Sequence, residues 1–154
     1  MHSCNICGNE IDFRTVRCPY CGNDQEIESM GHVRPEKKIF RLKTVNLEQG
    51  LPTVEQALNR LKNEISTARL EQITVLTLIH GYGSSGKGGI IRLECRKTLQ
   101  YLLSGGEIEA VVFGEEFSHR QPSVKQLLRR FPELLRNPHL NNHNKGITLV
   151  VLLP

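Results

Sequence analysis

The sequence has few aromatic residues and no long apolar run. Aromatic side chains make up 5% of its 154 residues and apolar side chains 38%, enough for one domain with a full core and a small appendage but not for a second large domain. No stretch of about 18 apolar residues could span a bilayer, and the N-terminus lacks the basic and apolar regions of a secretion signal. We therefore expect a soluble, cytoplasmic protein that has no membrane partner.

Charge of neither sign dominates the chain. The formal net charge is +4 and the isoelectric point is about 8.9. A balance this mild is compatible with a nucleic-acid partner but does not identify one.

Few cysteines lie outside two close pairs. Four of the five form Cys4-Asn-Ile-Cys7 and Cys18-Pro-Tyr-Cys21, two C-x2-C pairs separated by ten residues. Four thiolates at this spacing suit tetrahedral zinc with no open position, which is a structural role. Redox-active pairs would each need a following helix, which the sequence does not indicate, and iron is the other metal that such pairs hold. Cys95 lies on an apolar helical stripe and is interpreted as a core residue.

The composition divides the chain into three segments. Residues 1–22 carry the cysteine pairs and too few large apolar side chains to build a core, so they are predicted to form a zinc ribbon. Residues 23–38 are polar and charged, as in a linker. Residues 39–154 should form the main domain, with an insertion at 114–145.

Strand patterns and helix patterns alternate along the main domain. Thr53 and Gln56 form a capping box at the start of the first helix, and Gly105 and Gly106 end the second. The expected elements, in order, are strand 44–48, a helix after Thr53, strand 73–79, helix 87–103, strand 107–113 and strand 146–153. This βαβαββ-like order predicts a small two-layer α/β sandwich with a mostly parallel sheet.

The insertion at 114–145 is locally basic. Between residues 118 and 145 there are six lysine or arginine residues and one acid. Its apolar side chains predict a short amphipathic helix that Pro132 interrupts. Cations such as Arg129 and Arg130 could extend a phosphate-binding surface through counterion release. Alternatively, the segment is a cover over the sheet edge, with leucines inward and arginines outward.

The turn after the second predicted strand fits three templates. Its glycines match the G-x-G-x-x-G of a dinucleotide site and, with Lys87, most of a P-loop. The P-loop lacks its magnesium-binding hydroxyl, because Gly88 follows Lys87, and the dinucleotide site lacks an acidic residue about 20 positions further on. The third template is H-G-x-G, spelled by His80-Gly-Tyr-Gly83.

From about Val45 to Leu153 the chain resembles the Smr (small MutS-related) family. The hallmark of that family is a first strand bearing L-D-x-H-G, then a T-x-x-E-A-type helix, then a strand that ends in H-G-x-G. The corresponding segments here are Val45–Gly50, Thr53–Ala57 and His80–Gly83. The resemblance implies a compact α/β sandwich that binds DNA or RNA and nicks or cleaves it.

Two polar groups of the first motif are replaced. Asn46 stands where the family has Asp, and Glu48 stands where it has His. An amide cannot act as a base, whereas Glu48 could accept a proton or bind a metal, because it is expected on the same strand face as Asn46. The resemblance thus implies His80 and Glu48 as catalytic candidates, and the substitutions weaken the expectation of cleavage.

The resemblance also places nucleic-acid binding at the glycine turn, on the carboxyl edge of the sheet. Free amides, the start of the next helix and nearby cations would attract a phosphate there. The binding candidates are His80, Gly81, Tyr82, Gly83, Lys87, Arg92, Asn46, Arg129 and Arg130. Alternatively, His80 bonds the neighbouring backbone and holds the turn, and Lys87 and Arg92 are solvated surface charges.

An adaptor is the alternative function. In that case the zinc ribbon and the basic insertion would bind a protein or ribosomal partner, and the Smr-like fold would be a scaffold. The substituted first-strand motif is the feature that favours this alternative.

Overall fold

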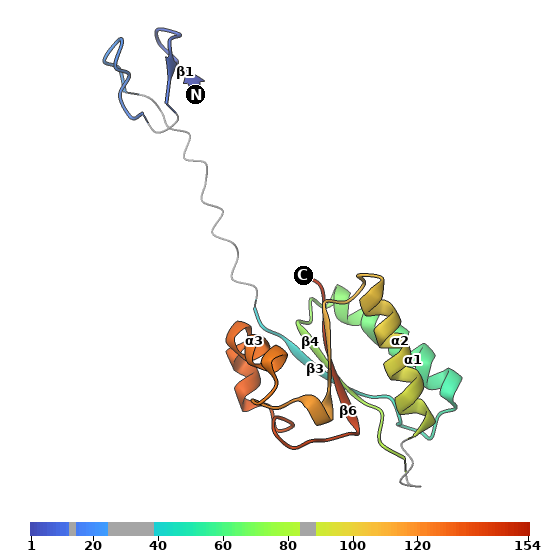
Figure 1. Ribbon diagram of the computed structural model, residues 1–154. Coiled ribbons are helices and arrows are strands. Elements are labelled where there is room, and N and C mark those ends of the chain that lie inside the picture. Colours follow the sequence, from blue (N-terminus) through green and yellow to red (C-terminus); the bar gives the residue numbers. More distant parts are fainter. Residues whose placement is uncertain (13–14, 25–38, 84–88) are drawn as a thin grey trace. The chain divides into compact units, whose positions relative to one another are not determined.

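The computed structural model describes residues 1–12, 15–24, 39–83 and 89–154. The chain divides into two compact units, Met1–Ile39 and Phe40–Pro154, which are drawn in Figure 1. Most of the predicted linker lies outside the described residues. No helix in the described part of the chain is long and apolar enough to cross a membrane.

A four-stranded sheet forms the centre of Phe40–Pro154 (Figure 1). Its strands, in spatial order, are β3 (Leu42–Asn46), β4 (Val75–Ile79), β6 (Ile147–Val151) and β5 (Ala110–Phe113). β3 and β4 pair in parallel, whereas β6 runs antiparallel to both β4 and β5. The α/β class and the βαβαββ order are confirmed, but the prediction of a mostly parallel sheet is wrong.

The last strand causes this difference. β3, β4 and β5 run in one direction, as successive crossover connections require, and β6 enters between β4 and β5, where all of its residues are buried. Its register sets Ile79 opposite Ile147 and Phe113 opposite Thr148. The ends of β4 and β5 and the start of β6 therefore meet at one end of the sheet.

Helices α1 (Val54–Leu70) and α2 (Ile90–Ser104) cover one face of the sheet (Figure 1). α1 begins at the predicted capping box between Thr53 and Gln56. α2 ends before Gly105 and Gly106, as predicted, and Gly106 has a φ of +70°. Side chains buried between these helices and the sheet are Val45, Leu47, Leu61, Ile65, Ala68, Leu76, Leu78, Cys95, Leu99, Ile108, Val150 and Leu152.

The basic insertion packs on the other face of the sheet. It folds into η1 (Gly114–Glu116), α3 (Pro122–Arg130) and η2 (Pro132–Arg136), so the predicted short helix does end before Pro132. The second core contains Val75, Val112, Phe117, Val124, Leu127, Leu128, Leu134, Ile147, Leu149 and Val151. The unit therefore has three layers and not the predicted two, because the apolar side of the insertion is buried against a sheet face.

The described residues of Met1–Ile39 form a small hairpin. β1 (His2–Ser3) pairs antiparallel with β2 (Glu10–Ile11). The buried apolar residues here are Cys4, Ile11 and Cys18. A core of this size is too small to hold a unit together by apolar burial alone, so a cross-link or a metal is required.

Candidate functional site

The two cysteine pairs form matching knuckles. The Gly8 N–H donates to the Cys4 carbonyl and the Gly22 N–H to the Cys18 carbonyl, both at 2.9 Å. The two glycines have φ values of +74° and +72°, a conformation that strongly favours glycine. This turn directs backbone amides at the sulfur atoms, and the Ile6 N–H donates to Cys4 Sγ at 3.5 Å.

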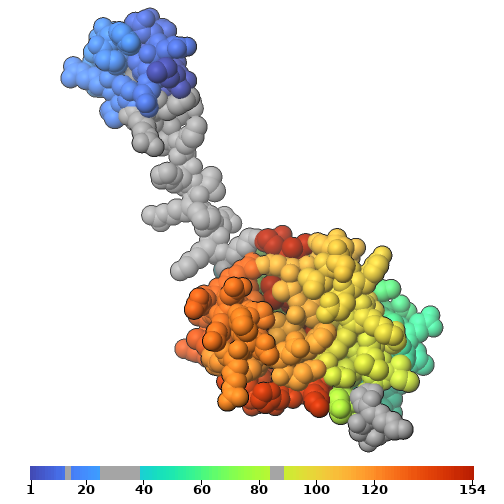
Figure 2. Space-filling model, viewed as in Figure 1, coloured from blue at the N-terminus to red at the C-terminus, as the bar shows by residue number. Residues whose placement is uncertain are grey.

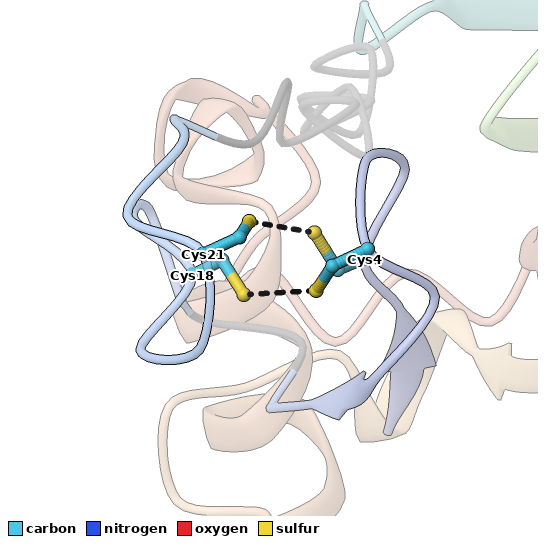
Figure 3. Close-up of side chains that lie close together, drawn as sticks. Cys4, Cys18 and Cys21 are labelled. Atoms are coloured by element: carbon cyan, nitrogen blue, oxygen red, sulfur yellow. Dashed lines mark hydrogen bonds between the residues drawn. The ribbon is translucent and has the colours of Figure 1, made fainter.

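The four paired cysteines gather into one cluster (Figure 3). All four Sγ atoms lie within 4.8 Å of one another, and the Cys4–Cys21 and Cys7–Cys18 sulfur pairs are each 3.7 Å apart. Zinc–sulfur bonds of about 2.3 Å in a tetrahedron separate the sulfurs by about 3.8 Å. The cluster matches this geometry, so these four cysteines can hold a metal ion such as zinc.

The surroundings of these cysteines affect their protonation. The Cys7 N–H is the main cause that lowers the pKa of the Cys4 thiol to about 6, and the Asn23 N–H lowers the pKa of Cys21. Burial raises the pKa of Cys18 to about 11. A divalent cation would favour the thiolate form at all four positions.

In Phe40–Pro154, the ends of β3 and β4 lie side by side. The Leu47 N–H donates to the Ile79 carbonyl at 2.8 Å. Because β3 ends at Asn46, Glu48 lies in the following turn, and the prediction that both share a strand face is wrong. Asn46 Oδ1 accepts from the Glu48 N–H at 2.9 Å, and the Glu48 carboxylate lies against Gly81 Cα. The structure thus brings the first-strand motif to the H-G-x-G turn.

The His80 side chain is fully buried at this turn. Its Nδ1 is 2.9 Å from the Gly81 carbonyl oxygen, and its Nε2 is 2.8 Å from Thr148 Oγ1. Because a carbonyl only accepts, Nδ1 carries the hydrogen and Nε2 accepts from the Thr148 hydroxyl. Both ring nitrogens are occupied, as in the interpretation in which His80 holds the turn.

This environment makes His80 a weak base. Burial is the main cause that lowers its pKa to about 4, and the positive charges of Arg96 and Arg92 lower it further. The ring is therefore neutral at pH 7, and its one free lone pair is already bonded to Thr148. Contact between His80 and a nucleic-acid backbone stays a prediction, and it requires the ring to leave this position.

Arg92 and Arg96 lie one turn apart on α2 and share Glu115. Arg96 donates to the two carboxylate oxygens at 2.6 and 2.7 Å, and Arg92 donates to one of them at 3.2 Å. Burial raises the pKa of Glu115, but the hydrogen bonds and charge of Arg96 and the charge of Arg92 outweigh it, and the pKa falls to about 2. Arg92 Nε also donates to the Lys145 carbonyl at 3.1 Å. Arg92 is therefore an anchored side chain and not a solvated surface charge.

The loop at 137–146, which precedes β6, forms one wall of an open depression of about 730 Å³. Figure 2 shows this loop, in red, next to the start of α2, in yellow-green. The depression is lined by Ile79, Gly81, Tyr82, His139, Asn142, His143, Asn144, Lys145, Gly146 and Ile147. The Lys145 Nζ lies 5.2 Å from the centroid of the Tyr82 ring, and the Arg92 Cζ lies 5.1 Å from it.

Several site residues are absent from the predicted set. Arg60 of α1 donates to the carbonyls of Leu47 and Gln49 and so holds the turn after β3. Arg96 could have been found, because it follows Arg92 by one helical turn and shares its face. Lys145 has only its place at the end of the basic insertion as a signal.

Other predicted residues lie elsewhere. Arg130 pairs with Glu109, whose N–H donates to the Val151 carbonyl. Val151 is at the far end of β6 from Ile147, about 13 Å along the strand, so the structure does not bring Arg130 or its neighbour Arg129 to the turn. Gly83 is exposed, with a φ of +91°. Lys87 lies outside the described residues.

The comparisons with known proteins find a similarity among solved structures. No protein-family model matches the sequence, and no curated protein matches it. Among solved structures, the chain is similar to the crystal structure of the Smr domain of Thermus thermophilus MutS2, with 23% identity, coverage of 73% of this chain and 99% of that chain, and a TM-score of 0.43.

Proposed function

We propose that Phe40–Pro154 is an Smr-type domain that binds nucleic acid at the end of the sheet where β3 and β4 terminate. The two segments that resemble the family motifs, Val45–Gly50 and His80–Gly83, meet there, with the Glu48 carboxylate against Gly81. This contact is the observation that carries the proposal. In α/β sheets, ligands bind in the crevice outside the carboxyl ends of the parallel strands.

The groups at this end can contact a polyanion. The N–H groups of His80 and Gly81 already donate to the Gly146 carbonyl, each at 3.0 Å, so they are not available to a phosphate. A nucleic acid would instead contact the exposed Lys145, together with Tyr82 and Gly83, the two residues that follow Gly81. One cation and an aromatic ring suit a nucleic-acid strand, because the cation neutralises a phosphate and the ring offers a stacking surface.

The geometry favours binding without cleavage. A general base needs a free lone pair within reach of the attacking water, and the lone pair of His80 is bonded inside the protein. Glu48 is an acid beside the turn, but it brings negative charge to the place where a phosphate must approach. We therefore expect wild-type protein to bind strands and leave them intact.

We also propose that Cys4, Cys7, Cys18 and Cys21 hold zinc in a structural role. The Cys4–Cys21 and Cys7–Cys18 sulfur pairs are each 3.7 Å apart, close to the edge length of a zinc tetrahedron, and all four sulfurs lie within 4.8 Å of one another. Four thiolates fill every coordination position, so no site for water or substrate would remain on the ion.

Binding is tested by measuring affinity for DNA and RNA, single-stranded and duplex, across a range of salt concentrations. The variant Lys145→Ala should weaken binding to every sequence and reduce the salt slope by about one phosphate contact. Lys97→Ala is the matched control, because Lys97 is 75% exposed on α2 and does not line the depression. It should leave both affinity and slope unchanged.

Two results would contradict the proposal. If no nucleic acid binds at low salt, or if affinity does not change with salt, the domain does not bind the phosphate backbone. If the wild type nicks plasmid DNA or cleaves RNA and a folded His80→Asn variant does not, the cleavage belongs to this protein and the expectation of binding without cleavage is wrong. Equal residual nicking by both proteins would instead indicate a contaminating nuclease.

The adaptor remains a second candidate because of the surface of the cysteine unit. Ile6 and Tyr20 occupy equivalent places in the two knuckles and are each 67% exposed. Exposed apolar side chains on so small a unit are a common feature of protein-binding surfaces. A stoichiometric protein partner that survives nuclease treatment, and that Ile6→Ser with Tyr20→Ser abolishes, would favour this function.

A further inference from the structure

The ring of Tyr82 is supported by a fixed cation and approached by a movable one. The Arg92 guanidinium is held by Glu115 and by the Lys145 carbonyl, and its side chain is 14% exposed, so it cannot easily leave the ring. Lys145 is exposed, and among the described residues its ammonium contacts only the Tyr82 ring. Lys145 can therefore swing aside for a ligand while Arg92 keeps the ring in place.

The rim of the depression carries a donor and an acceptor that have no partner among the described residues. Asn144 Oδ1 accepts from the Gly146 N–H at 2.9 Å, so its Nδ2 points at His139 Nδ1, 3.4 Å away, and must donate. His139 Nε2 then carries the hydrogen. His143 Nδ1 donates to the Glu115 carbonyl at 3.2 Å, which leaves its Nε2 as an acceptor.

The loop that carries these histidines has an unusual backbone. His143 has a φ of +50° and Asn141 a φ of +65°, in the left-handed region that Asn and His adopt more readily than most other residues with side chains. The Asn141 side chain stabilises the loop by accepting from the His119 N–H at 3.0 Å. The loop therefore places His139 and His143 at the rim of the depression.

We infer that the depression binds one unpaired nucleotide of a nucleic-acid strand, with its base stacked on Tyr82 and its phosphate neutralised by Lys145. The inference rests on the proposed function and names the part of the nucleic acid that this end of the sheet takes. A volume of about 730 Å³ is within the common range for small-ligand sites. Ile79 and Ile147 give the lining an apolar part, as a base face requires, and the histidine nitrogens match the donors and acceptors of a base edge.

A base in an intact duplex cannot reach this ring. The two faces of a base in a duplex are covered by neighbouring bases. Only an unstacked base can enter the depression and lie on an aromatic side chain. A single strand, a loop or a frayed end should therefore bind more tightly than a blunt duplex of the same sequence.

The test uses the full chain and an oligonucleotide about 12 nucleotides long, within the span of known single-strand sites. The strand carries one 2-aminopurine, whose fluorescence falls when the base stacks. We expect quenching by the wild type, tighter binding of the strand than of its duplex, and a roughly 5- to 150-fold loss of strand affinity in Tyr82→Leu. Tyr82→Phe should retain quenching, because it keeps the ring.

Tyr101→Leu is the matched control. Tyr101 belongs to α2, the helix that also carries Arg92, but it is 77% exposed and does not line the depression, so its loss should leave affinity and quenching unchanged. Thermal melting followed by circular dichroism shows whether Tyr82→Leu is folded. The comparison of strand with duplex on wild-type protein needs no variant and tests the inference even if that variant does not fold.

The inference and the proposed function can fail separately. No salt-dependent binding of any nucleic acid would remove both. Salt-dependent binding in which duplex and strand are equal, or in which Tyr82→Leu behaves as Tyr101→Leu, would keep the proposed function and overturn the unpaired-nucleotide site. Free adenosine monophosphate bound as tightly as the strand would also overturn it, because the site would then take a mononucleotide and not a strand.

Discussion

The imidazole of His80 donates to the carbonyl of its own turn and accepts from a hydroxyl on β6, and so it ties the end of β4 to the neighbouring strand. The same two bonds that make it useful to the fold remove both nitrogens from chemistry. A histidine in an H-G-x-G motif can therefore be required for the shape of the site without touching the ligand. The pH dependence of stability distinguishes the buried ring from an exposed one.

The burial of His80 predicts that stability falls in mild acid. Its pKa is about 4 in the folded protein against the ordinary histidine value of 6.5, so the unfolded chain binds the proton first. The contribution is fully present above pH 6.5 and is lost as the pH falls toward 4, by up to about 3 kcal/mol. Urea unfolding at a series of pH values measures this loss.

Two variants make that measurement specific. His80→Asn should flatten the dependence between pH 6.5 and 4.5, whereas His119→Asn, which changes an exposed histidine, should not. Glu115 also destabilises the fold in acid, but its pKa is lowered to about 2, so its effect lies below pH 4.5. A wild-type stability that is constant between pH 6.5 and 4.5 would show that the ring is not buried in solution.

Among the elements, the junction of β5 with η1 has the tightest packing around the site. Gly114 begins η1, and Glu115 directly follows it and receives Arg92 and Arg96 from α2. The backbone at 144–147 lies so close that a Cβ on Gly114 would overlap the Asn144 carbonyl oxygen and meet Ile147 Cγ1 at 2.5 Å. The close packing of β5, η1 and α2 against the loop at 137–146 therefore depends on the absence of a side chain at Gly114.

Gly114→Ala should accordingly destabilise Phe40–Pro154 by about 1–3 kcal/mol or more, because backbone atoms must move to admit the methyl group. It should also weaken strand binding, because the loop that carries Lys145 is displaced. Gly105→Ala is the control: its Cβ would meet no atom closer than 3.6 Å, and its φ is −80°. Thermal melting compares the stability of the two variants, and equal melting temperatures would contradict the close packing at Gly114.

In the whole molecule, the two units depend on different stabilising forces. Phe40–Pro154 buries two apolar cores on the two faces of its sheet. The described residues of Met1–Ile39 bury Cys4, Ile11 and Cys18, with Cys21 packed against them, so metal coordination must supply most of the stability. The two units should therefore respond differently to a chelator.

Purified without chelator, the chain should carry one zinc ion, and a strong chelator should unfold the cysteine unit alone. Metal analysis, limited proteolysis and circular dichroism check this: cleavage should appear within residues 1–24 while the melting transition of Phe40–Pro154 persists. Cys4→Ser should lose the metal. Cys95→Ala, at the buried fifth cysteine, should keep it and lower the stability of the other unit. Protein free of stoichiometric metal would contradict the zinc site.

Local rules predicted the elements well. The capping box at Thr53, the apolar stripes of α1 and α2 and the glycines after α2 depend on neighbours within a few residues, and they appear as expected. The placement of β6 did not follow from such rules, because a strand pattern does not state which neighbour it pairs with or in which direction. The role of Arg92 was missed for a similar reason: Glu115 and the Lys145 carbonyl are distant in sequence.

The sequence by itself determined the α/β order, the four-cysteine cluster and the two motifs, because each depends on residue type and short spacing. Only the tertiary structure decided that β6 enters between β4 and β5, and this places Thr148 beside His80 and the loop at 137–146 beside Tyr82. The burial of His80 and the depression both follow from that long-range pairing. Contacts between residues far apart in the chain are set by the packing of the whole unit, which no local pattern records.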